Sequence, residues 1–139
     1  MRRPTAGLAG LLLSGCAVLQ PGVPGWVANR QPLEACAVGV VSAGSAESAA
    51  GQQCILDAYR DRRGAELITA GEMATGDPLV SYLRVHENGT IEMFHNLGDD
   101  PSAPGAWERF RCEELAPPRQ DDPVPGTFTI GGCEMLPVP

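Results

Sequence analysis

The sequence predicts an α+β domain in which one N-terminal helix packs on a four- to five-stranded antiparallel sheet, with two disulfides. Three observations predict it. Residues 45–63 show the three- and four-residue apolar spacing of one amphipathic helix. Residues 65–130 then hold several strand-like runs separated by turn signals, a segregation typical of α+β domains. Four cysteines beyond the N-terminal segment suffice for two disulfides.

The first fifteen residues have the pattern of an export signal. Met1-Arg2-Arg3 is a short basic start, residues 6–13 are apolar, and small residues precede Cys16. The apolar run is too short to cross a bilayer as a helix. Leu13-Ser14-Gly15-Cys16 resembles the lipobox of bacterial lipoproteins. The resemblance implies cleavage before Cys16 and attachment of lipid to its sulfur, which would hold the protein on the extracytoplasmic face of the cell membrane.

The rest of the chain is expected to form a stalk and one domain. Residues 16–32 carry the lipid anchor and a turn-rich stretch, Gln20-Pro21-Gly22-Val23-Pro24-Gly25, that reads as a flexible stalk. Residues 33–139 form the domain, because a chain of 139 residues has room for only one.

The helix is the first firm element of the domain. Residues 37–41 before it are apolar and predict an edge strand or an extended lead-in. Ser45 can cap the helix start, and Gly64 stands where a left-handed terminal residue is wanted. The face expected to be buried carries Ala50, Cys54, Ile55 and Ala58.

Strands follow the helix, and one hairpin can be given a register. Strands are expected at 65–75, 79–86, 91–97, 107–115 and 127–130, with a turn at Gly76-Asp77-Pro78. A two-residue Asn88-Gly89 turn would mix polar and apolar side chains on both faces of the hairpin. A three-residue loop with Gly89 as a left-handed bulge residue separates them. It predicts the pairs Val85–Ile91, Leu83–Met93 and Leu79–Leu97 on one face, and Arg84–Glu92 and Tyr82–Phe94 on the other.

The cysteine count agrees with export. Five cysteines are an odd number, and assigning Cys16 to lipid leaves four for an oxidising compartment. Three pairings of these four exist. We favour Cys36–Cys54 and Cys112–Cys133, because each pair is local and joins segments expected to be neighbours. A loop of this length would stabilise the fold by about 3 kcal/mol. No two of these cysteines have the close spacing of a zinc knuckle.

A wider resemblance covers the second half of the chain. Thr75-Gly76-Asp77-Pro78, the hairpin with Gly89 and Ile91, Cys112, and Cys133-Glu134 together resemble a family of small bacterial lipoproteins whose domain has no known function. Asn96 stands where that family would have an acidic residue. The resemblance implies an exported lipoprotein with a Cys112–Cys133 bond, and it implies no activity.

Few residues point to chemistry. The formal charge is −7, and about −9 once a leader with two arginines is removed, which argues against nucleic acid as a partner. The only histidines, His86 and His95, are expected opposite Thr90 and Ser81, as solvent-facing strand residues. Asp99-Asp100 and Asp121-Asp122 precede prolines and predict turns rather than calcium ligands. No cofactor motif, metal site or catalytic constellation is expected.

Three functions remain as hypotheses. The first is a non-catalytic, lipid-anchored envelope domain that binds a protein, a peptide or a small ligand. The second is a protease inhibitor, because Glu72 to Pro78 resembles the reactive loop of secreted subtilisin inhibitors, with Met73 at the reactive position. Gly71-Glu72 replaces the cysteine that braces the loop in that family. The third is a hydrolase, suggested only by His86 and His95.

Overall fold

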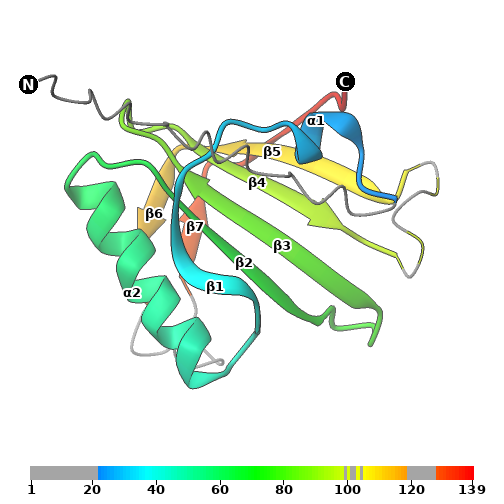
Figure 1. Ribbon diagram of the computed structural model, residues 1–139, viewed down its shortest axis with the longest axis horizontal. Helices are drawn as coiled ribbons and strands as arrows, with labels where there is room; N and C mark the ends of the chain where they lie inside the picture. Colours follow the sequence, from blue (N-terminus) through cyan, green and yellow to red (C-terminus); the bar gives the residue numbers. More distant parts are fainter. Residues whose placement is uncertain (1–21, 99, 101–102, 104, 119–127) are drawn as a thin grey trace, which may run out of the picture.

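The protein forms one mixed β-sheet with helices on both faces (Figure 1). The structure is a computed structural model that describes residues 22–98, 100, 103, 105–118 and 128–139. The elements are α1 (Gly25–Ala28), β1 (Glu34–Ser42), α2 (Ala46–Arg60), β2 (Ala65–Glu72), β3 (Pro78–Val85), β4 (Ile91–Asn96), β5 (Trp107–Cys112), β6 (Glu114–Ala116), β7 (Thr129–Gly131) and β8 (Glu134–Leu136).

The main sheet has six strands in the order β1-β2-β3-β4-β5-β8, and β6 pairs with β7 in a small second sheet. The α+β class is therefore correct in outline, but three details of the prediction are wrong. The main sheet has six strands instead of four or five. β1 runs parallel to β2, whereas the other neighbours are antiparallel. The helix is not N-terminal: α2 follows β1 and forms the crossover to β2. A crossover helix is the usual connection between neighbouring parallel strands, and residues 37–41 alone did not reveal a strand of nine residues.

Helix α2 begins as predicted and ends differently. The Ser45 side chain accepts a hydrogen bond from the Ser48 backbone N–H at 3.0 Å. At the other end Arg62, with φ of 55°, takes the left-handed conformation expected of Gly64. The buried face is also rotated from the prediction, because Ala50 is exposed. The helix instead buries Ser48, Gly51, Ile55, Leu56 and Ala58.

The β3–β4 hairpin has the predicted bulged loop. Gly89 has φ of 84°, and the ladder pairs Val85 with Ile91 and Leu83 with Met93. Arg84 pairs with Glu92 and Tyr82 with Phe94 on the other face. The ladder ends at Val80 and Asn96, so it does not include the predicted Leu79–Leu97 pair. Separation of the apolar set from the polar set fixes this register.

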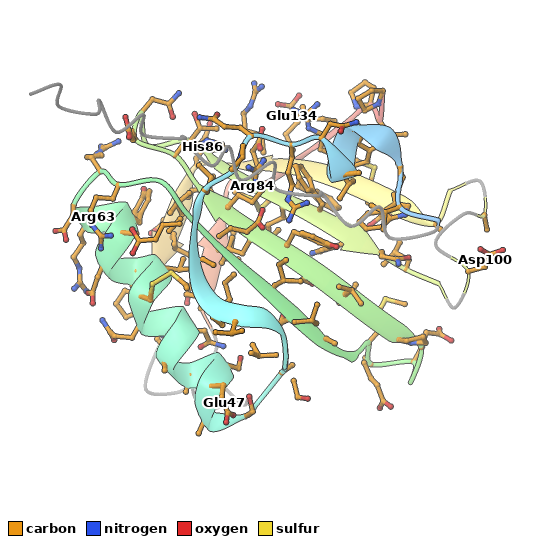
Figure 2. All side chains as sticks on the ribbon, in the orientation of Figure 1. Glu47, Arg63, Arg84, His86, Asp100 and Glu134 are labelled. Atoms are coloured by element: carbon orange, nitrogen blue, oxygen red, sulfur yellow. A yellow bond between two sulfur atoms is a disulfide. The ribbon has the colours of Figure 1, made fainter. Side chains whose placement is uncertain are left out.

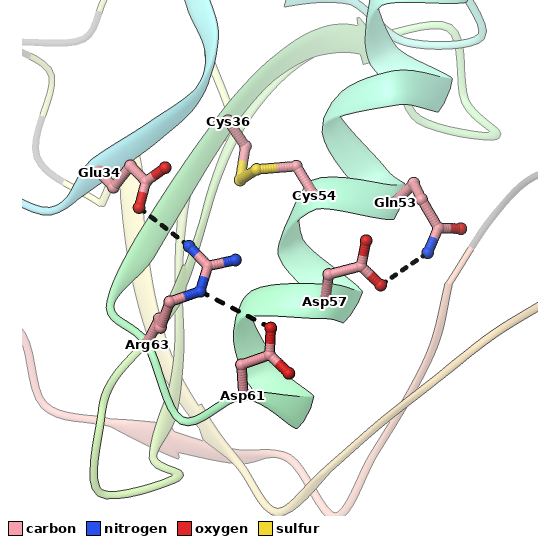
Figure 3. The surroundings of a disulfide bond; sticks show 7 residues. All are labelled: Glu34, Cys36, Gln53, Cys54, Asp57, Asp61 and Arg63. Atoms are coloured by element: carbon pink, nitrogen blue, oxygen red, sulfur yellow. Dashed lines mark hydrogen bonds and ion pairs between the residues drawn. A yellow bond between two sulfur atoms is a disulfide. The ribbon is translucent and has the colours of Figure 1, made fainter.

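Both favoured disulfides are present. Cys36 bonds to Cys54, which joins β1 to α2 (Figure 3), and Cys112 bonds to Cys133. Cys36 lies where β1 departs from regular pairing: between Ala35 and Val40 the strand advances five residues while β2 advances two. The disulfide therefore ties this irregular part of the edge strand to the helix.

Residues 23–32 belong to the fold, although the sequence predicted a flexible stalk up to residue 32. The Val27 side chain is fully buried, and the Trp26 ring meets Phe94 edge-on at 5.0 Å between centroids and Trp107 at 6.2 Å. Arg30 forms two hydrogen bonds of 2.7 Å with the Glu66 carboxylate of β2. Turn-forming glycines and prolines concealed these contacts, because their composition gives no sign of what the intervening side chains bury.

The two faces of the sheet hold separate cores. Ile55, Leu56 and Ala58 of α2 pack on Leu67, Leu83 and Ile91. Leu115 of β6 is part of this core, and Ile130 of β7 packs against it. On the opposite face Val27, Tyr82, Phe94 and Trp107 form a smaller cluster under α1. The strand predicted at 107–115 divides into β5 and β6, and β8 was not predicted. Thr127, the predicted start of the last strand, lies outside the described residues.

Candidate functional site

Helix α2 covers only part of its face of the sheet, and a pocket lies beside its N-terminal half. Figure 1 shows β2 and β3 extending well beyond the helix. The pocket has a volume of about 290 Å³. Its apolar lining comes from the sheet, the helix lead-in and the β7 region, and consists of Ala43, Leu67, Leu83, Met93, Phe128 and Ile130. Its polar lining consists of Ser48, Gln52, Thr69, Ser81 and His95.

The polar residues of the sheet form one row across neighbouring strands. Thr69 of β2 is opposite Ser81 of β3, and Ser81 is opposite His95 of β4. His95 in turn is opposite Glu108 of β5. The adjacent row is apolar and contains Leu67, Leu83, Met93 and Phe110. Because side chains alternate between faces along a strand, both rows project toward the α2 side. The sheet thus supplies an apolar floor with a polar border.

Several polar groups at this pocket lack partners. The Ser48 hydroxyl is fully buried and forms no hydrogen bond within the described part of the chain. Buried polar groups in folded proteins are nearly always paired with protein, water or ligand, so the Ser48 hydroxyl is an exception. The side chains of Gln52, Thr69 and Ser81 are partly exposed and form no hydrogen bond with the described residues. One buried unpaired hydroxyl and several partly exposed polar side chains beside an apolar floor are the composition expected of a small-molecule site.

His95 is the one titratable residue among the described residues that line the pocket. Its ring lies 5.2 Å from the Phe110 ring, and its Nδ1 is 4.0 Å from a carboxylate oxygen of Glu108. Burial lowers the pKa of His95 below its usual 6.5, and attraction to Glu108 opposes this only in part. His95 is therefore a neutral imidazole at pH 7, able to donate one hydrogen bond and accept another.

The opposite face holds a chain of buried charges. Arg84 is 3% exposed, and its Nε lies 2.8 Å from a Glu66 oxygen. Its other nitrogens contact Glu92 at 3.3 Å and the Gln31 backbone oxygen. Glu92 also binds Arg109 and His86, at 3.3 Å and 3.2 Å. Figure 2 shows Arg84 and His86 close to each other.

This cluster has a structural role that its contacts explain. Burial lowers the pKa of Arg84, whereas the hydrogen bonds that Arg30 donates to Glu66 raise the pKa of Arg30. Glu66 binds both arginines, so it connects residues 30 and 31 to the centre of the sheet. Arg30 also lies 4.9 Å above the Tyr82 ring, and Arg84 5.5 Å above the Phe94 ring. These ion pairs and hydrogen bonds hold residues 30 and 31 against the sheet.

The structure separates the two histidines. His95 is opposite Ser81 and the His86 backbone N–H donates to Thr90, as expected. However, His95 faces α2 and His86 faces the charged cluster, so they cannot form one site. Their side chains are 21% and 19% exposed, so they are not the solvent-facing residues that the sequence predicted. The alternation of the confirmed register could have revealed the separation, but not the burial.

Met73 lies in the tight turn between β2 and β3. Its backbone N–H donates to the Asp77 carbonyl at 2.8 Å, and its carbonyl accepts from the Gly76 N–H at 2.9 Å. A protease inhibitor of the subtilisin-inhibitor type presents an extended loop whose backbone pairs with the enzyme. Because the turn already uses both backbone groups of Met73, its geometry does not favour that function.

Other predicted positions can be placed briefly. Cys16, Asp99 and Asp121-Asp122 lie outside the described residues. Among the described residues, no group of three or more histidine, cysteine or acidic side chains is arranged to hold a metal ion. A wider hollow of about 680 Å³ lies between residues 22–26, Gly105 and Val138-Pro139, but its described lining residues include no charged side chain and are rich in glycine and proline. It offers fewer polar side chains than the α2 pocket.

Comparison with known proteins does not assign the chain to a family. Neither the family models, nor the curated proteins, nor the solved structures contain a match to this chain. The resemblance to small lipoproteins stays a prediction. No helix in the described part of the chain is both long and apolar enough to span a membrane.

Proposed function

We propose that the protein is a lipid-anchored extracytoplasmic lipoprotein whose non-catalytic domain binds a small ligand in the α2 pocket. The observation that carries the binding function is the pocket itself. It combines an apolar floor with polar side chains that have no partners among the described residues. Leu67, Leu83 and Met93 provide the floor, and Ser48 lies at the helix side.

The paired cysteines support the anchor. Cys36, Cys54, Cys112 and Cys133 bond to one another, so the chain has no cysteine left for Cys16. Disulfides are typical of exported proteins, and a single remaining cysteine after a lipobox-like sequence has an explanation in acylation. The four lipobox-like residues and the pairing are independent arguments for the same location.

The anchor would keep the domain close to the membrane. Gly22, the first described residue, is six residues after Cys16. Six residues span at most roughly 20 Å even when fully extended.

Binding is favoured over hydrolysis by the arrangement of the polar row. Ser81, His95 and Glu108 are the residue types of a hydrolytic triad. However, the 4.0 Å between His95 Nδ1 and Glu108 exceeds hydrogen-bond range, and no hydrogen bond joins Ser81 to His95 in the described structure. The three residues lie side by side along a sheet surface, an arrangement suited to contacting one edge of a ligand.

Two measurements test the proposal. Labelled palmitate should be incorporated into the native protein and not into the Cys16→Ser variant, and only the native protein should sediment with membranes. The neutral fluorescent probe N-phenyl-1-naphthylamine should bind the full chain carrying Cys16→Ser. Met93→Trp, which fills the pocket floor, should abolish that binding while circular dichroism stays unchanged. Labelling of Cys16→Ser would reject the anchor, and probe binding unaffected by Met93→Trp would reject the pocket.

A further inference from the structure

We infer that the pocket takes an uncharged amphipathic ligand, an apolar molecule with hydroxyl or amide groups along one edge, and that it discriminates against carboxylates. This inference rests on the proposed binding function and specifies its ligand. It follows from the charge of the lining, the position of the polar row and the protonation of His95.

Among the described residues, the lining carries no full charge. Arginine, aspartate and glutamate are all absent from the eleven described residues that line the pocket. The Glu108 carboxylate lies next to the lining residue His95, 4.0 Å from its Nδ1. A ligand carboxylate would lose its hydration without gaining a cation, and it would approach an existing negative charge. Burying an unpaired charge is far more costly than burying a hydroxyl group that finds a partner.

The polar residues lie on two sides of the apolar floor. Thr69, Ser81 and His95 border it on the sheet, and Ser48 and Gln52 border it on the helix. These side chains provide hydroxyl and amide groups that both donate and accept hydrogen bonds. A ligand with hydroxyl or amide groups satisfies them in either direction. A purely apolar ligand would leave them unpaired, which costs about as much as the lost hydrogen bonds would contribute.

The His95 ring adds one neutral donor and one neutral acceptor to the polar row. Its Nδ1 lies 4.0 Å from the Glu108 carboxylate, beyond hydrogen-bond range, and neither ring nitrogen has a hydrogen-bond partner in the described structure. A hydroxyl or amide group of the ligand can both donate and accept at this ring, whereas a carboxylate can only accept.

The volume limits the ligand to a small molecule. The 290 Å³ of the pocket equals the liquid volume of about ten water molecules. This is at the lower end of the range for small-molecule sites. A short aliphatic alcohol fits within it, whereas a long diacyl lipid does not.

A matched pair of probes tests the inference. The full chain carrying Cys16→Ser is loaded with N-phenyl-1-naphthylamine at pH 8, where octanoate is ionised and His95 is neutral. The probe is then displaced with 1-octanol or with octanoate, which have the same chain length and differ in the head group. We expect octanol to displace it at a concentration at least tenfold lower.

Two isosteric substitutions locate the polar contact. Thr69→Val and Ser81→Ala each remove one hydroxyl with little change in side-chain volume. Each should weaken the binding of octanol by about three- to tenfold. Their effect on octanoate should be under twofold. Neither variant removes a hydrogen bond of the described structure, so both are expected to fold as the parent does.

The outcomes separate the inference from the proposed function. If the probe binds and Met93→Trp abolishes binding, but octanoate displaces it as well as octanol does, the ligand class is wrong and the pocket stands. Equal loss for both competitors in Ser81→Ala would also overturn the ligand class. If Met93→Trp folds and leaves probe binding intact, the binding function itself is rejected. Ala43→Trp, at the exposed pocket rim, replaces Met93→Trp in this test if the latter does not fold.

Discussion

Replacing Glu66 with glutamine should loosen residues 23–32 from the sheet. Glu66 is the only acidic residue in contact with both Arg30 and Arg84 in the described structure. Its side chain is 13% exposed and that of Arg84 is 3% exposed, so water cannot replace the lost carboxylate. The cluster contains three arginines and two glutamates, and the substitution leaves three positive charges against one negative charge.

The expected loss follows from the contacts that the substitution removes. Arg30 makes two charge-assisted hydrogen bonds of 2.7 Å to Glu66, and Arg84 makes one ion pair of 2.8 Å. Glutamine keeps one acceptor oxygen and loses the charge. Removing one partner from a buried ionic group typically costs 3–5 kcal/mol. Because Arg84 keeps Glu92 and Arg30 is partly solvated, we expect a loss of about 3 kcal/mol in the free energy of unfolding.

Urea denaturation followed by circular dichroism measures this loss, and tryptophan emission reports the segment, because Trp26 packs against the sheet there. A fall of about 3 kcal/mol corresponds to roughly 10 °C in melting temperature for a domain of this size. Glu34→Gln is the matched control, since its partner Arg63 is 44% exposed and the pair should contribute under about 0.5 kcal/mol (Figure 3). Equal losses of stability for the two substitutions, or tryptophan emission that does not change in Glu66→Gln, would refute the role of Glu66 in holding residues 23–32 on the sheet.

Two further predictions concern the disulfides and His95. The bonded cysteines are 18 and 21 residues apart, so replacing either pair with alanine should lower the free energy of unfolding by about 3 kcal/mol in urea denaturation; a change under about 1 kcal/mol would contradict the chain-entropy account. Because burial lowers the pKa of His95, the unfolded chain takes up its proton first, near pH 6.5, and the folded chain only at lower pH. Stability should therefore fall more steeply below pH 6.5 in the native protein than in His95→Asn; equal losses between pH 7.5 and 5.5 would show that the pKa of His95 is not lowered.

The sequence predicted correctly those features of the fold that depend on residues close together in the chain. The Asn88-Gly89 sequence and the alternation around it fixed the β3–β4 register, because a shift of one residue would have turned Ile91 and Met93 toward the other face. Sequence proximity was enough to favour both disulfides. In the same way Ser45, ahead of an apolar periodic segment, marked the start of α2.

Long-range pairing was harder to predict. The direction of β1 depends on β2, which lies beyond the helix, and the irregular stretch from Cys36 to Gly39 breaks the alternation that would identify a strand. Val38 is 99% exposed there although it is apolar. The N-terminal segment was missed for a related reason. Arg30 binds a carboxylate 36 residues away, and no local spacing reveals such a partner.

The candidate site could not be predicted because no motif defines it. Thr69, Ser81 and His95 are unremarkable in the sequence and become neighbours only through two strand pairings. The predicted register already placed His95 opposite Ser81, so two of the four residues in the polar row could be paired from the sequence. Whether a polar row lies beneath a helix or beside it depends on where the helix ends on the sheet, and only the structure supplies this.

The position of the pocket follows from how α2 is held. Its second half carries Ile55, Leu56 and Ala58 in the core, and the Cys36–Cys54 bond ties it to β1. Its first half reaches the sheet chiefly through Ser48 and Gly51, where a Cβ added to Gly51 would lie 2.5 Å from Leu67. Small residues bring the helix close at these points without filling the space beyond them. The helix is therefore held firmly at one end, and the free volume lies at the other, beside the polar row that we assign to the ligand.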